Sequence, residues 1–308
     1  MITITIVSAQ STSIVLLIEF PLYNLKAYWA GWSDAPLSVH GMNQAKALGL
    51  SLKHTKVDAI FASPLLRALW TVGQSISSSI STDDPQSQQI EKNQSPKPPL
   101  TISPLLREQH FGIAERKPFG EGKNGYVRGP GRHFKFDDGE SLDDVRKRAN
   151  EAIANFIEPI LQESRGQPAS SKHIVVVAHG IFNAEFIGAL LARRKDAAPL
   201  EWGYRGMTNT GWTRLEVGYK DEARETAIPK VITEPEGPVS ASSAPASSAP
   251  PPLRSSEADL QTLAVSVLCT DVTTHLDGVH RQKGGIGSQG FDEKQKDLRA
   301  FFGGASSE

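Results

Sequence analysis

The sequence is poor in cysteine and has no excess of charge of either sign, and both absences exclude classes of protein. The 308 residues include a single cysteine, Cys269, so no disulfide can form within the chain. Lys and Arg (33) nearly balance Asp and Glu (34), which gives a formal net charge of −1. Without a basic stripe there is no electrostatic case for nucleic-acid binding. A lone cysteine also fits a reducing compartment, and we expect a cytoplasmic protein.

The sequence also lacks a long uninterrupted apolar run. Its apolar start, residues 1–22, is broken by Ser, Thr and Gln, includes Glu19 and Pro21, and has no basic stretch before it. A secretory signal needs a basic region followed by an apolar one, and a spanning helix needs about 20 apolar residues. We interpret this segment as strand material and expect no membrane association, with a secretory segment as the less favoured alternative.

Proline, serine and alanine are concentrated in residues 234–256, where too few apolar side chains remain to form a core. We therefore predict three parts of the chain. The core spans residues 1–220, with an atypical start over residues 1–23. A linker spans residues 221–258, and a partly disordered C-terminal extension spans residues 259–308.

Within the extension, two short patterns stand out. Residues 263–268 are apolar enough to predict an edge strand. Residues 281–288 mix basic residues with glycines, a composition that can hold a phosphate group. Because no strand precedes this run and its spacing does not match a phosphate-binding loop, we favour the interpretation of a flexible tail.

The most informative stretch is residues 172–191, KHIVVVAHGIFNAEFIGALL. Its apolar run, residues 174–177, predicts a strand that is covered on both faces. Small residues then flank His179, and apolar residues at helical spacing resume over residues 181–191. This order places His179 at the carboxyl end of a strand and the start of a helix, where free N–H groups attract anions. Two interpretations remain open here: a bound phosphate facing His179, or a histidine that only caps the turn.

A second strand, turn and helix follow the same order. Residues 57–61, VDAIF, predict a strand, and residues 62–70, ASPLLRALW, lead through a turn into a helix. Arg67 falls near the start of this helix, at the edge of the sheet where we expect His179. Its guanidinium could hold a phosphate through paired hydrogen bonds. The alternative for an isolated arginine is a solvated position on the surface.

Further elements are predicted from periodicity and capping residues. Residues 2–6 alternate and residues 14–18 form a continuous apolar run, so one of them should be the first strand. Ser38 is a candidate N-cap for a helix that ends at Leu52. Residues 141–162 predict a helix that opens with a capping box, and residues 212–217 predict the last strand of the core.

Two irregular segments and one carboxylate complete the pattern. Residues 75–99 are rich in Ser, Gln and Pro and predict a long loop, and residues 117–139 predict a glycine-rich lid or surface loop. Glu108 lies between apolar neighbours in LLREQHFG. It could act as a general acid if a pocket raised its pKa, or it could be an ordinary solvated glutamate.

Four segments in this order resemble the histidine phosphatase superfamily, the phosphoglycerate mutase-like proteins. They are GWSDAPLSVHGMNQAKALG, ASPLLRAL, LLREQHFGIAE and VVVAHG, and the resemblance covers roughly residues 24–217. It implies an α/β fold, a three-layer α/β/α sandwich with a mostly parallel central sheet. Within these segments the pattern differs at Arg116, which stands where a glycine commonly follows Glu115.

The resemblance also implies a site and a chemistry. An imidazole nitrogen attacks phosphorus, Arg67 and His179 neutralise the phosphoryl oxygens, and Glu108 protonates the leaving alkoxide. The phosphate would also contact Asn24 and Gly180. The partner is a small phosphorylated substrate, no metal or other cofactor is required, and a phosphatase is favoured over a mutase.

The motif that would supply the attacking histidine, Arg-His-Gly at the end of the first strand, is missing. No Arg-His pair occurs before Arg67. If Asn24 ends the motif, the arginine and histidine positions fall on Leu17 and Ile18. Isoleucine has no lone pair, and loss of a nucleophile costs several orders of magnitude in rate.

Three hypotheses follow from this absence. The first, which the intact segments favour, is an enzyme whose translated start has been misplaced, so that residues 1–22 replace the true motif. The second is a pseudoenzyme that binds phosphorylated ligands without turning them over. The third is a scaffold whose linker and C-terminal extension recruit a protein partner.

Overall fold

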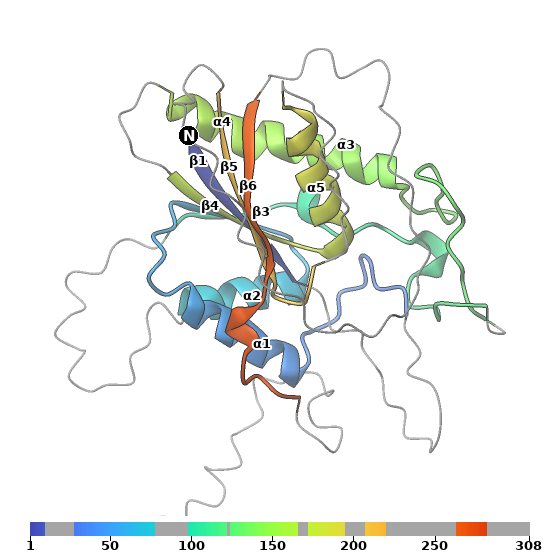
Figure 1. Ribbon diagram of the computed structural model, residues 1–308. Helices are drawn as coiled ribbons and strands as arrows, with labels where there is room; N and C mark the ends of the chain where they lie inside the picture. Colours follow the sequence, from blue (N-terminus) through green and yellow to red (C-terminus); the bar gives the residue numbers. More distant parts are fainter. Residues whose placement is uncertain are drawn as a thin grey trace, which may run out of the picture.

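The computed structural model describes seven stretches of the chain, which form one sheet with helices on both sides (Figure 1). These stretches are residues 1–9, 28–77, 98–121, 124–165, 172–194, 207–219 and 263–281. The strands are β1 (Ile2–Ser8), β2 (Ala59–Ala62), β3 (Leu100–Ile102), β4 (Lys172–Ala178), β5 (Trp212–Tyr219) and β6 (Leu263–Val272). The α-helices are α1 (Val39–Ser51), α2 (Leu66–Ser77), α3 (Leu142–Ala152), α4 (Glu158–Glu163) and α5 (Gly180–Ala192).

The six strands follow the order β3-β2-β4-β1-β5-β6. The pairs β2–β3, β2–β4 and β1–β4 are parallel, whereas β5 runs antiparallel to both β1 and β6. Only β5 therefore reverses direction, and the predicted mostly parallel sheet is confirmed. The parallel strands β1, β2 and β4 end at one edge of the sheet, which is where ligands of such sheets bind.

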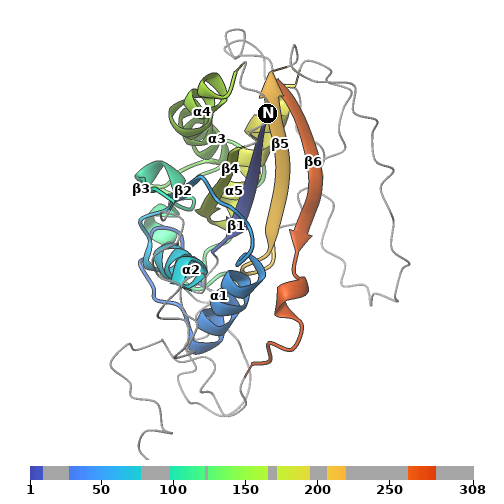
Figure 2. The same ribbon diagram turned by 90° about the vertical axis from the view of Figure 1, so that its left-hand side faces the viewer.

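The sheet separates two apolar clusters, as the alternation of side chains along its strands requires. On one face, Ile2, Ile4 and Ile6 of β1 pack with side chains of α3, α4 and α5. On the other face, Val7 of β1 packs with side chains of α1 and α2. Figures 1 and 2 show the resulting layers, with α1 and α2 on one side and α3 to α5 on the other. The predicted three-layer α/β/α sandwich is confirmed.

The helices begin where the capping residues predict. Ser38 is the N-cap of α1 and accepts a hydrogen bond from the Gly41 N–H at 3.1 Å. Ser141 and Asp144 form a complete capping box at α3, in which each side chain accepts from the other residue's backbone N–H. The predicted helix over residues 141–162 is also confirmed, since a single π-helical turn joins α3 to α4.

Other boundaries differ by a few residues. The strand expected at residues 57–61 begins at Ala59, and the strands expected at residues 174–177 and 212–217 are longer. The first strand is the alternating run, because β1 is Ile2–Ser8, and the run at residues 14–18 lies outside the described residues. No helix among the described residues is both long and apolar enough to cross a membrane.

The C-terminal extension contributes to this sheet. The predicted edge strand is present and longer than expected, since β6 pairs with β5 along Leu263–Val272. Its buried Leu263 and Val265 join the apolar cluster on the α5 side. The linker predicted over residues 221–258 and the glycine-rich run after residue 281 lie outside the described residues. The sheet thus includes part of the segment that sequence analysis assigned to an extension.

The predicted lid has an aromatic centre. Its described residues, 117–121 and 124–139, include no helix or strand. Trp29 packs against Phe111, Phe119 and Phe136, with ring centroids 4.7, 4.9 and 5.3 Å apart. The Trp29 Nε1–H also donates to a backbone carbonyl of this loop at 3.0 Å. These contacts attach the loop to the segment that precedes α1.

Candidate active site

His179 lies in the turn between β4 and α5, and its side chain is buried with 1% exposed. It is the N-cap residue of α5, but its side chain makes no capping hydrogen bond. Its Nε2 lies 2.7 Å from Ser63 Oγ, and its Nδ1 lies 3.0 Å from the Ala9 carbonyl oxygen. His179 therefore stands at the cap position, but its side chain does not cap the helix. The imidazole lies instead between the ends of β1 and β2.

Arg67, the second residue of α2, is 2% exposed and contacts His179 directly. Its Nε–H donates to His179 Nδ1 at 3.2 Å, and its terminal nitrogens donate to the carbonyls of Gly31 at 2.7 Å and Ser33 at 3.0 Å. The prediction that Arg67 lies at the same edge of the sheet as His179 is confirmed, and the solvated alternative is wrong. A buried cation needs such acceptors to offset its lost hydration.

The protonation state of His179 follows from these neighbours. Burial lowers the pKa of His179 well below its usual range, and the positive charges of Arg67 and Arg148 lower it further. The imidazole is therefore neutral and carries a proton on one nitrogen only. Nδ1 can donate to the Ala9 carbonyl or accept from Arg67, but not both.

Glu108 is buried at the N-terminus of α5, so the alternative of a solvated glutamate is wrong. Its Oε1 accepts from the backbone N–H groups of Gln109 at 2.8 Å and Phe182 at 3.1 Å, and its Oε2 accepts from Ile181 at 3.1 Å. Desolvation raises the pKa of Glu108, although these hydrogen bonds and the charge of Arg67 act in the opposite direction. A carboxyl group with a raised pKa suits general acid catalysis.

The helix N-terminus is not an empty anion site. Sequence analysis expected free N–H groups at the start of this helix, but those of Ile181 and Phe182 are occupied by the Glu108 carboxylate. The positive end of the helix dipole thus stabilises a side chain of the protein itself. Gly180 is buried as the first residue of α5, and Asn24 lies outside the described residues.

The position across from His179 is occupied by Ala9. The Ala9 N–H donates at 2.8 Å to the carbonyl of the residue before His179, continuing the parallel register of β1 and β4. The resemblance implies an attacking histidine at the end of the first strand. In this structure β1 ends at Ser8 and the residue that follows is Ala9, whereas Leu17 and Ile18, the positions counted back from Asn24, lie outside the described residues. The Ala9 side chain is a methyl group, which has no atom able to attack phosphorus.

A second carboxylate shapes the loop around Arg67. Glu115 accepts hydrogen bonds from the Trp32 N–H at 2.8 Å and from Ser33 Oγ at 2.7 Å. These bonds fix the loop whose carbonyls face Arg67. The next residue, Arg116, has a φ of 61°, in the left-handed region that favours glycine. The arginine that stands here in place of the family's usual glycine therefore has a strained backbone conformation.

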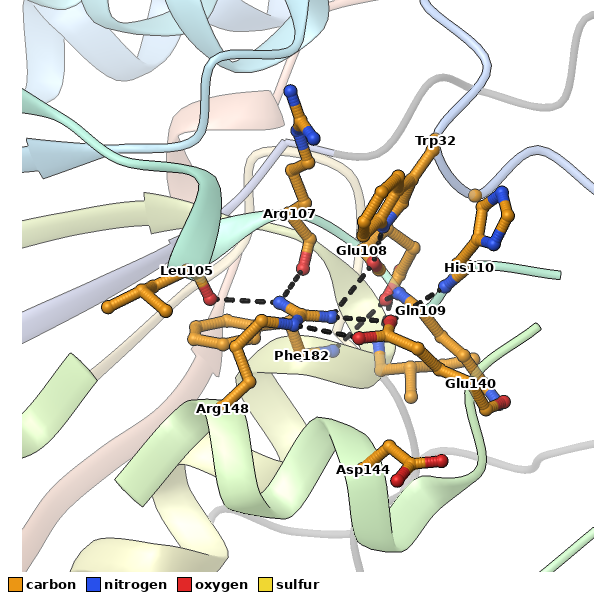
Figure 3. Close-up of polar contacts among 12 residues, drawn as sticks. Trp32, Leu105, Arg107, Glu108, Gln109, His110, Glu140, Asp144, Arg148 and Phe182 are labelled. Atoms are coloured by element: carbon orange, nitrogen blue, oxygen red, sulfur yellow. Dashed lines mark hydrogen bonds and ion pairs between the residues drawn. The ribbon is translucent and has the colours of Figure 1, made fainter. Parts of the chain in front are cut away.

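Sequence analysis missed Arg148 of α3, whose guanidinium contacts the segment carrying Glu108 (Figure 3). It donates to the carbonyls of Leu105 at 2.8 Å, Arg107 at 2.7 Å and Glu108 at 3.1 Å, and forms an ion pair with Glu140 at 2.7 Å. The available signal was an arginine on the apolar face of a helix, three residues after the buried Val145 and four before the buried Ala152.

Metal-ligating side chains do not gather near these residues. Within the stretches that the structure describes, no three or more His, Cys, Asp or Glu side chains are placed to hold a metal ion. The titratable groups that the structure brings together at the end of the sheet are a neutral imidazole, a buried guanidinium and a carboxyl group.

Comparison with protein families and curated proteins gives matches over much of the chain. The model of the histidine phosphatase superfamily (branch 1) matches residues 21–84 and 86–226. The 2,3-bisphosphoglycerate-dependent phosphoglycerate mutase of Chlamydia trachomatis serovar L2 is 30% identical over 178 residues, covering 52% of this chain and 74% of that protein. A probable phosphatase of Schizosaccharomyces pombe is 32% identical over 179 residues, covering 58% of this chain and 55% of the yeast protein.

Solved structures resemble the fold. A structure described as mycobacterial hydrolase 1 aligns with a TM-score of 0.52 and 17% identity, covering 89% of this chain and 99% of that one. The chain belongs to the histidine phosphatase superfamily. The relatives include both mutases and a probable phosphatase, so family membership alone does not choose between the two reactions.

Proposed function

We propose that this chain binds phosphomonoesters at the site formed by Arg67, Glu108 and His179, and that it lacks the group needed to form a phosphohistidine. The observation that carries this proposal is Ala9, which lies across from His179 at the end of β1. No residue before His40 is a histidine, so residues 10–27 cannot supply the missing imidazole either. The remaining side chains suit binding and protonation rather than attack.

The chemistry expected of each residue follows from its surroundings. Arg67 supplies a full positive charge, and neutral His179 supplies one hydrogen bond to a phosphoryl oxygen. Glu108, whose pKa is raised by desolvation, is the group that would deliver a proton to a leaving alkoxide. Binding and electrostatic terms survive the loss of a nucleophile, whereas covalent catalysis does not.

Binding requires a local rearrangement around Arg67. Its terminal N–H groups donate to the carbonyls of Gly31 and Ser33. A phosphate dianion must replace these carbonyls, and a charged acceptor forms the stronger hydrogen bonds. We therefore expect ligand binding to shift the loop over residues 30–33.

A second candidate is an active phosphatase, expressed from a transcript whose first codons differ from this sequence. It is supported by the close approach of Arg67 to His179, which a site without function has no reason to retain. Sequencing the transcript across the first thirty codons distinguishes the candidates, since the active enzyme requires an Arg-His pair before residue 24.

The proposal is tested by titrating inorganic phosphate into the purified chain and measuring binding by calorimetry. We expect saturable binding that weakens tenfold or more in Arg67→Gln, because a charge-assisted hydrogen bond contributes about 1.5–3 kcal/mol. His179→Gln provides a second variant in case the first does not fold. We also expect no phosphohistidine after incubation with p-nitrophenyl phosphate. Absence of phosphate binding, or phosphorylation of any histidine, would contradict the proposal.

A further inference from the structure

Arg148 donates hydrogen bonds to the carbonyls of one short segment, residues 105–108, and to its counter-ion Glu140. Its Nη1 donates to the carbonyls of Leu105 and Arg107, and its Nη2 donates to the carbonyl of Glu108. Its Nε donates to Glu140 Oε1 at 3.0 Å and its Nη2 to Glu140 Oε2 at 2.7 Å. Figure 3 shows this fork reaching from α3 to the segment that carries Glu108.

Glu140 fixes the other side of the same segment. Its Oε2 accepts the backbone N–H of His110 at 2.9 Å, and its carbonyl accepts from Gln109 Nε2 at 2.6 Å. Residues on both sides of Glu108 are therefore attached to one ion pair. That ion pair is partly shielded from water, since the side chains of Arg148 and Glu140 are 11% and 20% exposed.

The peptide unit between Glu108 and Gln109 connects this ion pair to the acid. Its carbonyl accepts from Arg148 Nη2 at 3.1 Å and from Trp32 Nε1 at 2.8 Å. Its N–H donates to the Glu108 carboxylate at 2.8 Å. A peptide whose carbonyl is bound by a cation becomes a stronger donor at its N–H, because hydrogen bonds in a chain polarise one another.

We propose that Arg148, with Glu140 as its counter-ion, is a positioning residue that holds the Glu108 carboxylate against the N-terminus of α5. Arginine suits this role because its five N–H donors are fixed in one plane, whereas lysine offers one nitrogen. The function of Glu108 as an acid rests on the proposed function. Its placement by Arg148 does not, and can be measured separately.

The test is amide hydrogen exchange at Ile181 and Phe182, whose N–H groups donate to Glu108. Ile181 is the primary reporter, because the Arg148 guanidinium also lies over the Phe182 ring, 5.3 Å from its centroid. We expect Arg148→Met to speed their exchange roughly tenfold or more, the effect of losing a hydrogen bond to a charged group. Arg146→Met is the matched control. Arg146 lies on the same helix but pairs with Glu185 in α5, at 2.7 Å.

A double-mutant cycle separates positioning from a general loss of packing. Glu108→Gln alone should speed the same two amides, and adding Arg148→Met to it should cause little further change, since both substitutions remove one interaction. If the two effects add, Arg148 stabilises α5 without acting through Glu108, and the proposal is wrong.

Arg148→Lys keeps the proposal testable if Arg148→Met does not fold. The lysine retains the charge beside Glu140 but cannot reach three carbonyls as well, so we expect the amides to exchange faster here too. Full protection in Arg148→Lys, or equal acceleration in Arg146→Met, would overturn the proposal. Because exchange needs no bound phosphate, failure here leaves the phosphomonoester site untouched, and failure of phosphate binding leaves this test intact.

Discussion

At the scale of single residues, the site depends on groups whose protonation is set by burial. Glu108 belongs to the segment that Arg148 binds, and its side chain is buried at the N-terminus of α5. Desolvation raises its pKa. His179 is enclosed beside Arg67, and desolvation lowers its pKa. Burial thus disfavours the charged form of both groups, and it moves their pKa values in opposite directions.

The raised pKa of Glu108 predicts how stability changes with pH. Below the ordinary carboxyl pKa, Glu108 is protonated in the folded and unfolded states and has no pH-dependent effect. As pH rises toward the raised folded pKa, the unfolded chain ionises more readily, so folding becomes less favourable. Relative to Glu108→Gln, the wild-type free energy of unfolding should fall across this window, by about 1.4 kcal/mol for each tenfold change in proton affinity.

Urea denaturation of both proteins at a series of pH values checks this expectation. The control is Glu163→Gln, because Glu163 is an exposed carboxylate paired with Lys172. A constant difference between wild type and Glu108→Gln from pH 4 to pH 8 would contradict the raised pKa.

At the scale of elements, α3 matters because it carries both the capping box and Arg148. Ser141 Oγ accepts from the Asp144 N–H at 3.1 Å and donates to Asp144 Oδ2 at 2.8 Å. The Asp144 carboxylate also accepts the Ser141 N–H, and this bond is the main reason that the pKa of Asp144 is lowered. The start of the helix is therefore fixed at one residue, which fixes where Arg148 projects.

We predict that Ser141→Ala lowers the free energy of unfolding by about 1–2 kcal/mol, the upper range for loss of an N-cap. Ser38→Ala at α1, which removes a single capping bond, should cost less. Urea denaturation of both variants checks the order. Equal costs would show that the reciprocal bonds of the capping box add nothing.

The elements were largely readable from the sequence, while the connections between them were not. Apolar runs and caps gave β4, α1 and α3 because these signals are local. The contact of Arg148 with residues 105–108 spans some forty positions, and no local pattern encodes it. The residue across from His179 was not readable for a similar reason: only the pairing of β1 with β4 shows that Ala9 lies there.

At the scale of the whole molecule, the sheet extends beyond the residues that resemble the family. The family model ends at residue 226, but β6 pairs with β5 and buries Leu263 and Val265, which are 1% and 6% exposed. The scaffold hypothesis could be tested by deleting residues 234–308 and looking for a lost protein partner. This deletion would, however, also remove β6. A chain ended after residue 281 keeps β6 and suits a test of the scaffold hypothesis.

We predict that a chain ended after residue 262 unfolds at lower urea than one ended after residue 281. Burial of a Val or Leu side chain contributes about 1.5–3 kcal/mol, so loss of Leu263 and Val265 should be readily measured. Identical transitions for the two chains would mean that β6 adds no stability to the sheet.

The central claim is that Ala9 occupies the place of the attacking histidine. Its most direct test is mass spectrometry for phosphohistidine on the wild-type chain and on Ser8→Arg/Ala9→His, after incubation with p-nitrophenyl phosphate. We predict no phosphohistidine in the wild type and a phosphohistidine at position 9 in the variant. A wild-type chain phosphorylated on another histidine, or a folded variant that binds phosphate but is never phosphorylated at position 9, would contradict the account.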